Sequence, residues 1–277
     1  MISLKFNANE EIGNKYYKEY NCQFVPHLLF LDSNGDEVDR IIGFMPPSEY
    51  LLRLENIVNK RNTLADYLAR YKNGEENIEI IAAIAMKYED RKIDEKAAKF
   101  YKILISQYPN SSSDYYQQAE YFLASYEFHN GKEDSFKQYI KASPDSPFIL
   151  DAFKEMTYYF ADTKQLDKEL STYKEMLALF PKNPTVLNSY AWRMAEVEKN
   201  LEDALIKVRI AVTLTNENSD RQAGIIDTEA EVLWKLKRYN EAIDAINKSI
   251  KIDPENGYYK DQKEKFIQSM KEEGRPV

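Results

Sequence analysis

The sequence is poor in the residues that build most metal and disulfide sites. It has one cysteine, Cys22, and two histidines in 277 residues. An intrachain disulfide is therefore excluded, and the usual zinc sites lack their Cys and His ligands. Glycine and proline are also scarce, with 8 and 10 residues, which favours long helices over many short strands. We expect no metal site and no cofactor.

Long apolar runs and basic runs are missing too. No stretch approaches the roughly 18 apolar residues that a membrane span needs, and residues 1–5 do not open a signal peptide. The net charge is −8, and no run of Lys and Arg is interleaved with aromatic residues. Nucleic-acid binding and membrane insertion are therefore not expected. As written, the sequence predicts a cytoplasmic protein.

Residues 1–60 carry mixed strand and helix signals. Apolar residues alternate over 2–6, which predicts a short strand, and recur at spacing four over 9–20, which predicts a helix. Two further strands, joined by an Asn-Gly turn, predict a β-hairpin over 28–43. A second helix is predicted over 48–59. Its inward face is expected to carry Tyr50, Leu51, Leu54 and Val58.

From about residue 62 onward the apolar pattern is helical and repeats with a period near 35 residues. The first unit is marked by Ala85, Tyr88, Ala97, Tyr101, Leu104 and Pro109. Equivalent positions in a second unit are Thr157, Phe160, Tyr173, Met176 and Pro181. The third unit is marked by Trp192, Ala195, Ala204, Val208 and Ala211, and the fourth by Ala230, Leu233, Ala242, Ile246, Ser249 and Pro254. Small residues at fixed offsets let paired helices approach closely, and each helical hairpin needs a neighbour to cover its apolar face.

These offsets resemble the tetratricopeptide repeat family. The resemblance implies a mainly α fold, a tetratricopeptide-type α-α superhelix, over residues 75–277. Residues 112–144 are expected to form a fifth, irregular hairpin, and residues 256–272 a solvating C-terminal helix. Residues 61–74 read as a connecting helix.

Residues 1–60 resemble the C-terminal half of a thioredoxin fold, a small α/β fragment. The matching features are Tyr20–Pro26 with Cys22 among them, the apolar run 28–31, the turn 32–35, the strand end at Gly43 and the helix start at Pro47. The resemblance implies a cis peptide bond before Pro26. The half of the fold that holds the Cys-x-x-C motif does not occur here, so dithiol chemistry cannot operate within this chain.

The missing half leaves several arrangements open for residues 1–60. They could pair differently, be partly disordered, or exchange strands with a second copy to form a homodimer. We favour an upstream half that lies before Met1, which would make Met1 an internal or misassigned start. A bare strand edge would otherwise be open to pairing.

Isolated candidate residues point to plain structural roles. Cys22 is expected to be a buried apolar residue rather than a nucleophile. Residues 32–36 resemble a calcium loop only superficially, because Gly35 falls at the fourth position instead of the sixth, so a hairpin turn is preferred. His27 and His129 have no Ser, Cys or Asp motif around them, so no catalytic residue is predicted.

Proteins of the tetratricopeptide family bind peptides along the surface lined by the first helix of each repeat. By register, the resemblance places on that surface Lys154, Tyr158, Ser189, Arg193, Asp227 and Glu231. The Lys/Asn clamp that some members use for a terminal carboxylate is not reproduced. The sequence therefore predicts a scaffold that binds a protein or peptide, with a redox-inactive thioredoxin-like remnant. The alternative is a fragment of a thiol–disulfide oxidoreductase whose Cys-x-x-C half lies upstream of Met1.

Overall fold

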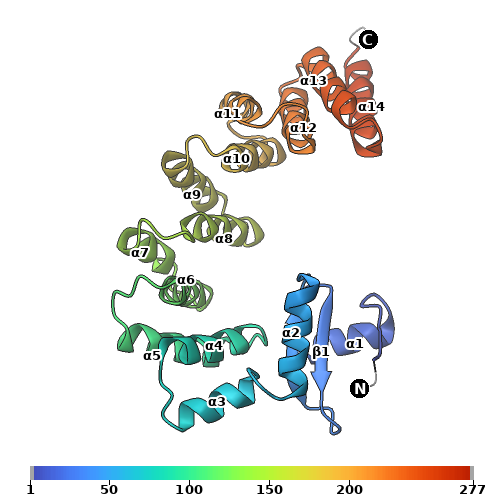
Figure 1. Cartoon of the computed structure of the whole chain (residues 1–277). Helices are drawn as coiled ribbons and strands as arrows, with labels where there is room; N and C mark the ends of the chain where they lie inside the picture. The colour runs from blue at the N-terminus through green and yellow to red at the C-terminus, as the bar shows by residue number, and fades with distance from the viewer. Residues whose placement is uncertain (1–2, 275–277) are drawn as a thin grey trace. The chain divides into compact units, whose positions relative to one another are not determined.

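The computed structural model describes residues 3–274, which are mostly helical (Figure 1). The chain divides into two compact units, one ending at Ala152 and the other beginning at Phe153. A small two-stranded sheet lies in the first unit, and the described part of the second unit is helical throughout. The mainly α fold class predicted from the sequence is confirmed.

The first unit opens with a helix, a β-hairpin and a second helix. These elements are α1 (Glu11–Glu19), β1 (His27–Leu31), β2 (Glu37–Ile42) and α2 (Pro47–Val58). The strands are antiparallel, with His27 opposite Ile42. In the turn, Oδ1 of Asp32 accepts hydrogen bonds from the backbone N–H groups of Asn34, at 2.8 Å, and Asp36, at 3.0 Å. Gly35 has a φ of +88°, which a side chain would disfavour. This part of the prediction, a hairpin turn, is confirmed.

The strand predicted at residues 2–6 is wrong. Residues 3–7 form no strand, and Ile2 lies outside the described residues. The sheet has only β1 and β2 within the described part of the chain, so this segment has no strand beside it to pair with. Phe6 instead lies against Tyr16 of α1, with 5.1 Å between ring centroids.

The inward face predicted for α2 is wrong in part. Leu51 and Val58 were expected inside, yet their exposed fractions are 63% and 58%. Ile57 is the buried apolar residue of the helix, and Arg53, one turn before it, forms an ion pair with Asp39 at 3.0 Å. The charge pair turns the Arg53–Ile57 side of the helix inward. An unpaired buried carboxylate costs more free energy than an apolar side chain left exposed to water.

The rest of the first unit is built from helical hairpins. Its helices are α3 (Leu64–Lys72), α4 (Ile78–Glu89), α5 (Asp94–Gln107), α6 (Asp114–His129) and α7 (Ser135–Ala142). Helix α4 packs on α5 and α6 packs on α7 (Figure 1). The fully buried ring of Tyr101 anchors this core, because its hydroxyl donates to Glu89 at 2.7 Å. Helix α7 is only 8 residues long, which accounts for the irregular pattern of residues 112–144.

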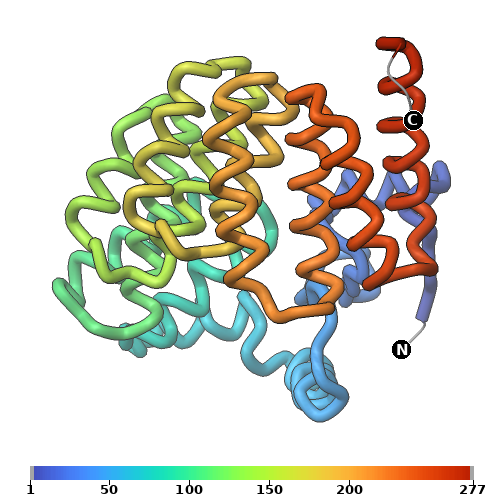
Figure 2. The backbone as a smooth tube through the Cα atoms, turned by 90° about the horizontal axis from the view of Figure 1, so that it is seen from above, coloured from blue at the N-terminus to red at the C-terminus, as the bar shows by residue number. Residues whose placement is uncertain are grey.

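The second unit continues the same architecture. Its helices are α8 (Ile149–Asp162, which contains the boundary), α9 (Leu166–Leu179), α10 (Pro184–Val197), α11 (Leu201–Thr213), α12 (Asp220–Lys235), α13 (Tyr239–Ile252) and α14 (Gly257–Glu272). Helices α12, α13 and α14 stand side by side (Figure 2). In α14 the predicted apolar side is buried, as shown by Tyr259, Phe266 and Met270.

Local sequence signals set where these helices begin and end. The first helix of most hairpins, and α14, starts after an Asn or Ser whose side chain accepts a backbone N–H; these caps are Asn77, Ser113, Asn183, Ser219 and Asn256. The prolines of the repeat pattern lie two residues after the end of the second helix of a hairpin. Pro109 follows α5, Pro181 follows α9 and Pro254 follows α13. The small residues of the repeat pattern are fully buried, among them Ala85, Ala97, Ala204 and Ala242.

Two pairs of successive first helices are in contact, α4 with α6 in the first unit and α10 with α12 in the second. We call the surface that the first helices form in a unit its first-helix surface. Because a first helix is flanked by other first helices, side chains that point away from the second helices gather on this surface.

Candidate functional site

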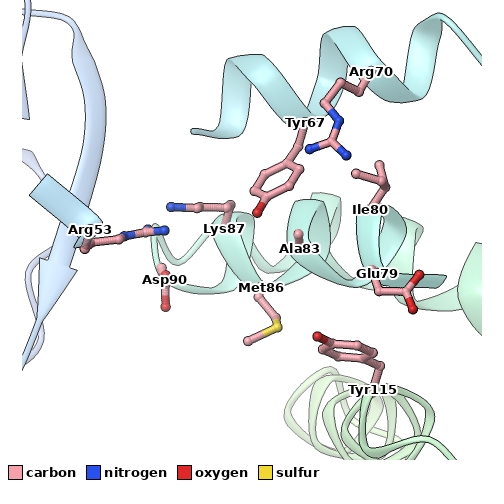
Figure 3. Close-up of a pocket in the computed structure, with 10 residues that line it drawn as sticks. All are labelled: Arg53, Tyr67, Arg70, Glu79, Ile80, Ala83, Met86, Lys87, Asp90 and Tyr115. Carbon is pink, nitrogen blue, oxygen red and sulfur yellow. The ribbon is translucent and has the colours of Figure 1, made fainter. Parts of the chain in front are cut away.

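A pocket of about 400 Å³ opens in the first unit where α2, α3, α4 and α6 meet. It is lined by Arg53, Tyr67, Arg70, Glu79, Ile80, Ala83, Met86, Lys87, Asp90 and Tyr115 (Figure 3). Three of these residues are cations and two are tyrosines, while Ala83 and Met86 supply an apolar wall. A pocket with an apolar wall and a few converging polar groups is the usual form of a binding site.

The helices that hold the pocket are fixed by their own sequences. Helix α3 is capped by Thr63, whose Oγ1 accepts the N–H of Asp66 at 3.3 Å. Tyr67 and Arg70 lie three residues apart on this helix, and the guanidinium lies 5.6 Å from the tyrosine ring centroid. On α4 and just beyond it, Ala83, Met86, Lys87 and Asp90 follow the helical spacing of three and four that places side chains on one face.

A buried carboxylate beneath the pocket organises its cations. Asp39 of β2 is fully buried, and both of its oxygens lie 2.6 Å from Nζ of Lys87. Arg53 reaches Oδ2 of the same carboxylate at 3.0 Å, and Arg91 reaches Oδ1 at 3.5 Å. Three cations, one from α2, one from α4 and Arg91 just after α4, therefore share one carboxylate from the hairpin.

A second carboxylate continues this network. Oε1 of Glu37 accepts a hydrogen bond from Nε of Arg40 at 2.9 Å and forms an ion pair with Nη2 of Arg91, also at 2.9 Å. Arg40 also donates to the backbone carbonyls of Asp90 and Tyr20, each at 2.9 Å. The network thus ties β2 both to the end of α4 and to the end of α1. Buried charges of this kind are tolerated only when they are paired and hydrogen-bonded.

The pKa values of Lys87 and Asp90 reflect their burial and the positive charges around them. Burial, together with the neighbouring guanidinium groups of Arg53 and Arg91, lowers the pKa of Lys87 to about 8, although Asp39 opposes the shift. Burial also raises the pKa of the Asp90 carboxyl, which the nearby cations only partly offset.

The chemically reactive side chains Cys22 and His27 lie outside the pocket. Burial raises the pKa of the Cys22 thiol, which lowers the fraction of reactive thiolate. Both ring nitrogens of His27 are buried without a hydrogen-bond partner, and burial lowers its pKa. Between residues 3 and 274 there is no group of three or more His, Cys, Asp or Glu residues placed to hold a metal ion. The Val25–Pro26 peptide bond is cis.

The six residues expected on the first-helix surface all lie in the second unit and do not line the pocket. On α8, Tyr158 is 73% exposed and Lys154 is half-buried. On α10, Ser189 is exposed, whereas Arg193 binds Glu169 of α9, with 2.6 Å between Nε and Oε1.

On α12, Asp227 and Glu231 lie one turn apart and repel each other. Asp227 is only 5% exposed, and its Oδ1 has no hydrogen-bond partner. Burial, followed by the charge of Glu231, raises the pKa of Asp227 to about 6. Glu231 itself is neutralised by Nζ of Lys265 at 2.5 Å. This pair is therefore less acidic toward a ligand than the sequence suggests.

Sequence reasoning did not identify the residues of the pocket. Tyr67 was assigned to a connecting helix and Tyr115 to the irregular fifth hairpin. The one available signal was the pair Asp39-Arg40 inside the predicted strand, because charged residues in a strand between apolar ones need buried partners.

Comparison with solved structures finds helical-repeat proteins of low identity. A structure described as YrrB, a TPR protein with an unusual peptide-binding site, is 15% identical, covers 72% of this chain and 97% of its own, and has a TM-score of 0.49. BtubC from P. vanneervenii is 12% identical, covers 68% and 86%, and has a TM-score of 0.47. The Cut9–Hcn1 structure is 16% identical with a TM-score of 0.41 and covers 74% of this chain, which spans only 39% of that chain.

At these identities and TM-scores the likenesses identify neither a family nor a ligand. No protein-family model matches the sequence, and no curated protein matches it. The helical-hairpin repeat architecture therefore rests on the helices and contacts described above. None of the described helices is both long and apolar enough to cross a membrane.

Proposed function

We propose that this protein is a scaffold that binds a segment of another protein on its first-helix surface. The observation that carries the proposal is the preformed pocket between α2, α3, α4 and α6, where aromatic, apolar and cationic side chains converge. A scaffold of stacked hairpins offers an extended surface on which further contacts can be added.

Exposed side chains on the first-helix surface of the second unit support the same function. Tyr158 leaves 73% of its surface open on α8, so its ring is accessible to a partner. We propose that Lys154, Ser189 and Arg193 line a binding surface of the second unit together with Tyr158. Asp227 and Glu231 would contribute less, because one is buried and the other is paired with Lys265.

Site-specific photo-crosslinking in an extract of the source cells tests the proposal. A benzoylphenylalanine at Tyr115 or Tyr158 is expected to give defined protein adducts. The matched controls are Lys99 on α5 and Lys174 on α9, which are exposed on second helices. Adducts at the first-helix positions alone support the scaffold. Equal adducts at all four positions, or none at Tyr115 and Tyr158, would overturn it.

We further propose that residues 1–60, of which the structure describes 3–60, are a redox-inactive remnant related to half of a thioredoxin fold. The order α1, β1, β2, α2 supports this relation. The protein is expected not to accelerate insulin reduction by dithiothreitol. Turnover that disappears in Cys22→Ser would contradict the proposal and favour an oxidoreductase.

A further inference from the structure

We propose that the pocket between α2, α3, α4 and α6 binds the carboxylate side chain of an Asp or Glu in a partner polypeptide. The inference rests on the proposed scaffold function and adds the chemistry of the bound segment. It depends on the balance of charges, on unused hydrogen-bond donors and on the position of Glu79.

The ion network behind the pocket contains more cations than carboxylates. Its cations are Arg40, Arg53, Lys87 and Arg91, and the carboxylates that pair with them are Glu37 and Asp39. Asp90 lies near these cations without an ion pair within 4.0 Å in the described chain. A further anion is therefore favoured here, although the protein as a whole carries a net charge of −8.

Arg53 is the cation best placed to receive that anion. Its side chain is 27% exposed, whereas that of Lys87 is 7% exposed. Its ion pair with Asp39 uses Nη2, and a guanidinium has five N–H donors in a planar fork. The remaining donors can grip a planar carboxylate through two parallel hydrogen bonds.

Two tyrosine hydroxyls complete the donor set. In Figure 3 the hydroxyl ends of Tyr67 and Tyr115 both point to the side on which Met86 lies. They come from α3 and α6, so they approach the pocket from different helices. A ligand carboxylate at Arg53 would lie on the Tyr67 side, and the apolar part of the segment would rest on Met86.

The two remaining charges set the direction of the bound segment. Arg70 is engaged by Glu75 at 3.0 Å and by the ring of Tyr67. Glu79 lies just over two turns before Lys87 on α4 and would repel a carboxylate placed near it. The acidic residue of the partner therefore binds at the Arg53 end of the pocket.

The experiment uses the full chain and fluorescence anisotropy with fluorescein-labelled hexaglutamate at low salt. Labelled hexaglutamine is the neutral probe of equal length. We expect hexaglutamate to bind and hexaglutamine to bind at least about tenfold more weakly, because the charge-assisted hydrogen bonds are lost. Affinity should fall as salt is added, since the contact is electrostatic.

Three variants locate the site. Arg53→Gln is expected to weaken hexaglutamate binding about tenfold, and Tyr67→Phe about threefold, since each removes donors to the carboxylate. Arg61→Gln is the matched control, because Arg61 also lies near the end of α2 but is 57% exposed and pairs with Glu55 outside the pocket. Tyr67→Phe leaves the ion network intact, so a folding defect in Arg53→Gln would not obscure the result.

The outcomes separate this inference from the function on which it rests. Equal weakening by Arg53→Gln and Arg61→Gln, or no weakening by either Arg53→Gln or Tyr67→Phe, would overturn the carboxylate site. Displacement of hexaglutamate by millimolar inorganic phosphate would overturn the choice of a carboxylate in favour of a phosphate. Crosslinking at Tyr115 without any hexaglutamate binding would leave the scaffold standing and remove only the acidic ligand.

Discussion

Asp227 offers a direct test of the electrostatics of α12, because it is a buried carboxyl group with an unsatisfied oxygen. The substitution Asp227→Asn keeps the shape of the side chain and removes the charge. At neutral pH the wild-type carboxylate is ionised although it is 5% exposed, its Oδ1 is unpartnered and Glu231 repels it. We therefore expect the amide to stabilise the second unit.

The size and sign of the effect follow from the pKa of Asp227. Its pKa is about 6 in the folded protein, against an ordinary value of 3.8. The folded state binds more protons than the unfolded state between these values, so the contribution of Asp227 to stability is lost as pH rises through that window. At 1.36 kcal/mol per pKa unit, ionisation of Asp227 lowers the free energy of unfolding by about 3 kcal/mol above pH 6. This value is an upper limit for the gain from Asp227→Asn, because the new amide must find its own hydrogen-bond partners.

Tryptophan fluorescence reports on this region alone, because the two tryptophans, Trp192 and Trp234, both lie in the second unit. In urea titrations at pH 7.5 we expect Asp227→Asn to raise the free energy of unfolding by about 1–3 kcal/mol. At pH 4 the gain should nearly vanish. Asp244→Asn, on the exposed side of α13, is the control for net charge. A similar gain from the control, or a less stable Asp227→Asn protein at pH 7.5, would refute the reasoning.

Three further changes test the fold. Asn183→Ala removes the cap of α10 and should cost about 1 kcal/mol in a urea titration followed by tryptophan fluorescence. Phe136→Ala leaves a cavity under a fully buried ring of α7 and should cost about 3–5 kcal/mol, read by circular dichroism. Arg193→Gln leaves the buried Glu169 carboxylate without its ion pair and should cost about 1–3 kcal/mol by tryptophan fluorescence, whereas no loss would show that the pair is dispensable.

The helical repeats were predictable because their signals are local and repeated. Small residues at the helix crossings and a proline after the second helix occur at the same offsets in several units. Burial then follows from geometry, as at Ala97 and Ala204, which are fully buried. Trp192 is an exception: it is only half-buried, and its indole N–H donates to Glu196 at 3.0 Å. A pattern of offsets cannot distinguish a buried position from one at the edge of the core.

The N-terminal part was predicted less well because its signals depend on distant partners. Alternating apolar residues at 2–6 fit a strand, but a strand forms only beside another strand. The orientation of α2 was wrong because it depends on the pair between Arg53 and Asp39, on different elements. The pocket was missed for the same reason, since its central contact joins Lys87 and Asp39, 48 residues apart. Periodicity in the sequence contains no information on such a pairing.

The buried network around Asp39 links these observations to the proposed site. A two-stranded hairpin is at best marginally stable by itself, so β1 and β2 need a fixed place against the helices. Removing one member of a buried ion network leaves uncompensated charge, which makes any other placement of the hairpin costly. The carboxylate of Asp39 on β2 holds two cations in the pocket, Arg53 of α2 and Lys87 of α4. The N-terminal segment is thus part of the proposed binding site rather than an appendage to the repeats, because the pocket keeps its cations in place only while the hairpin is docked.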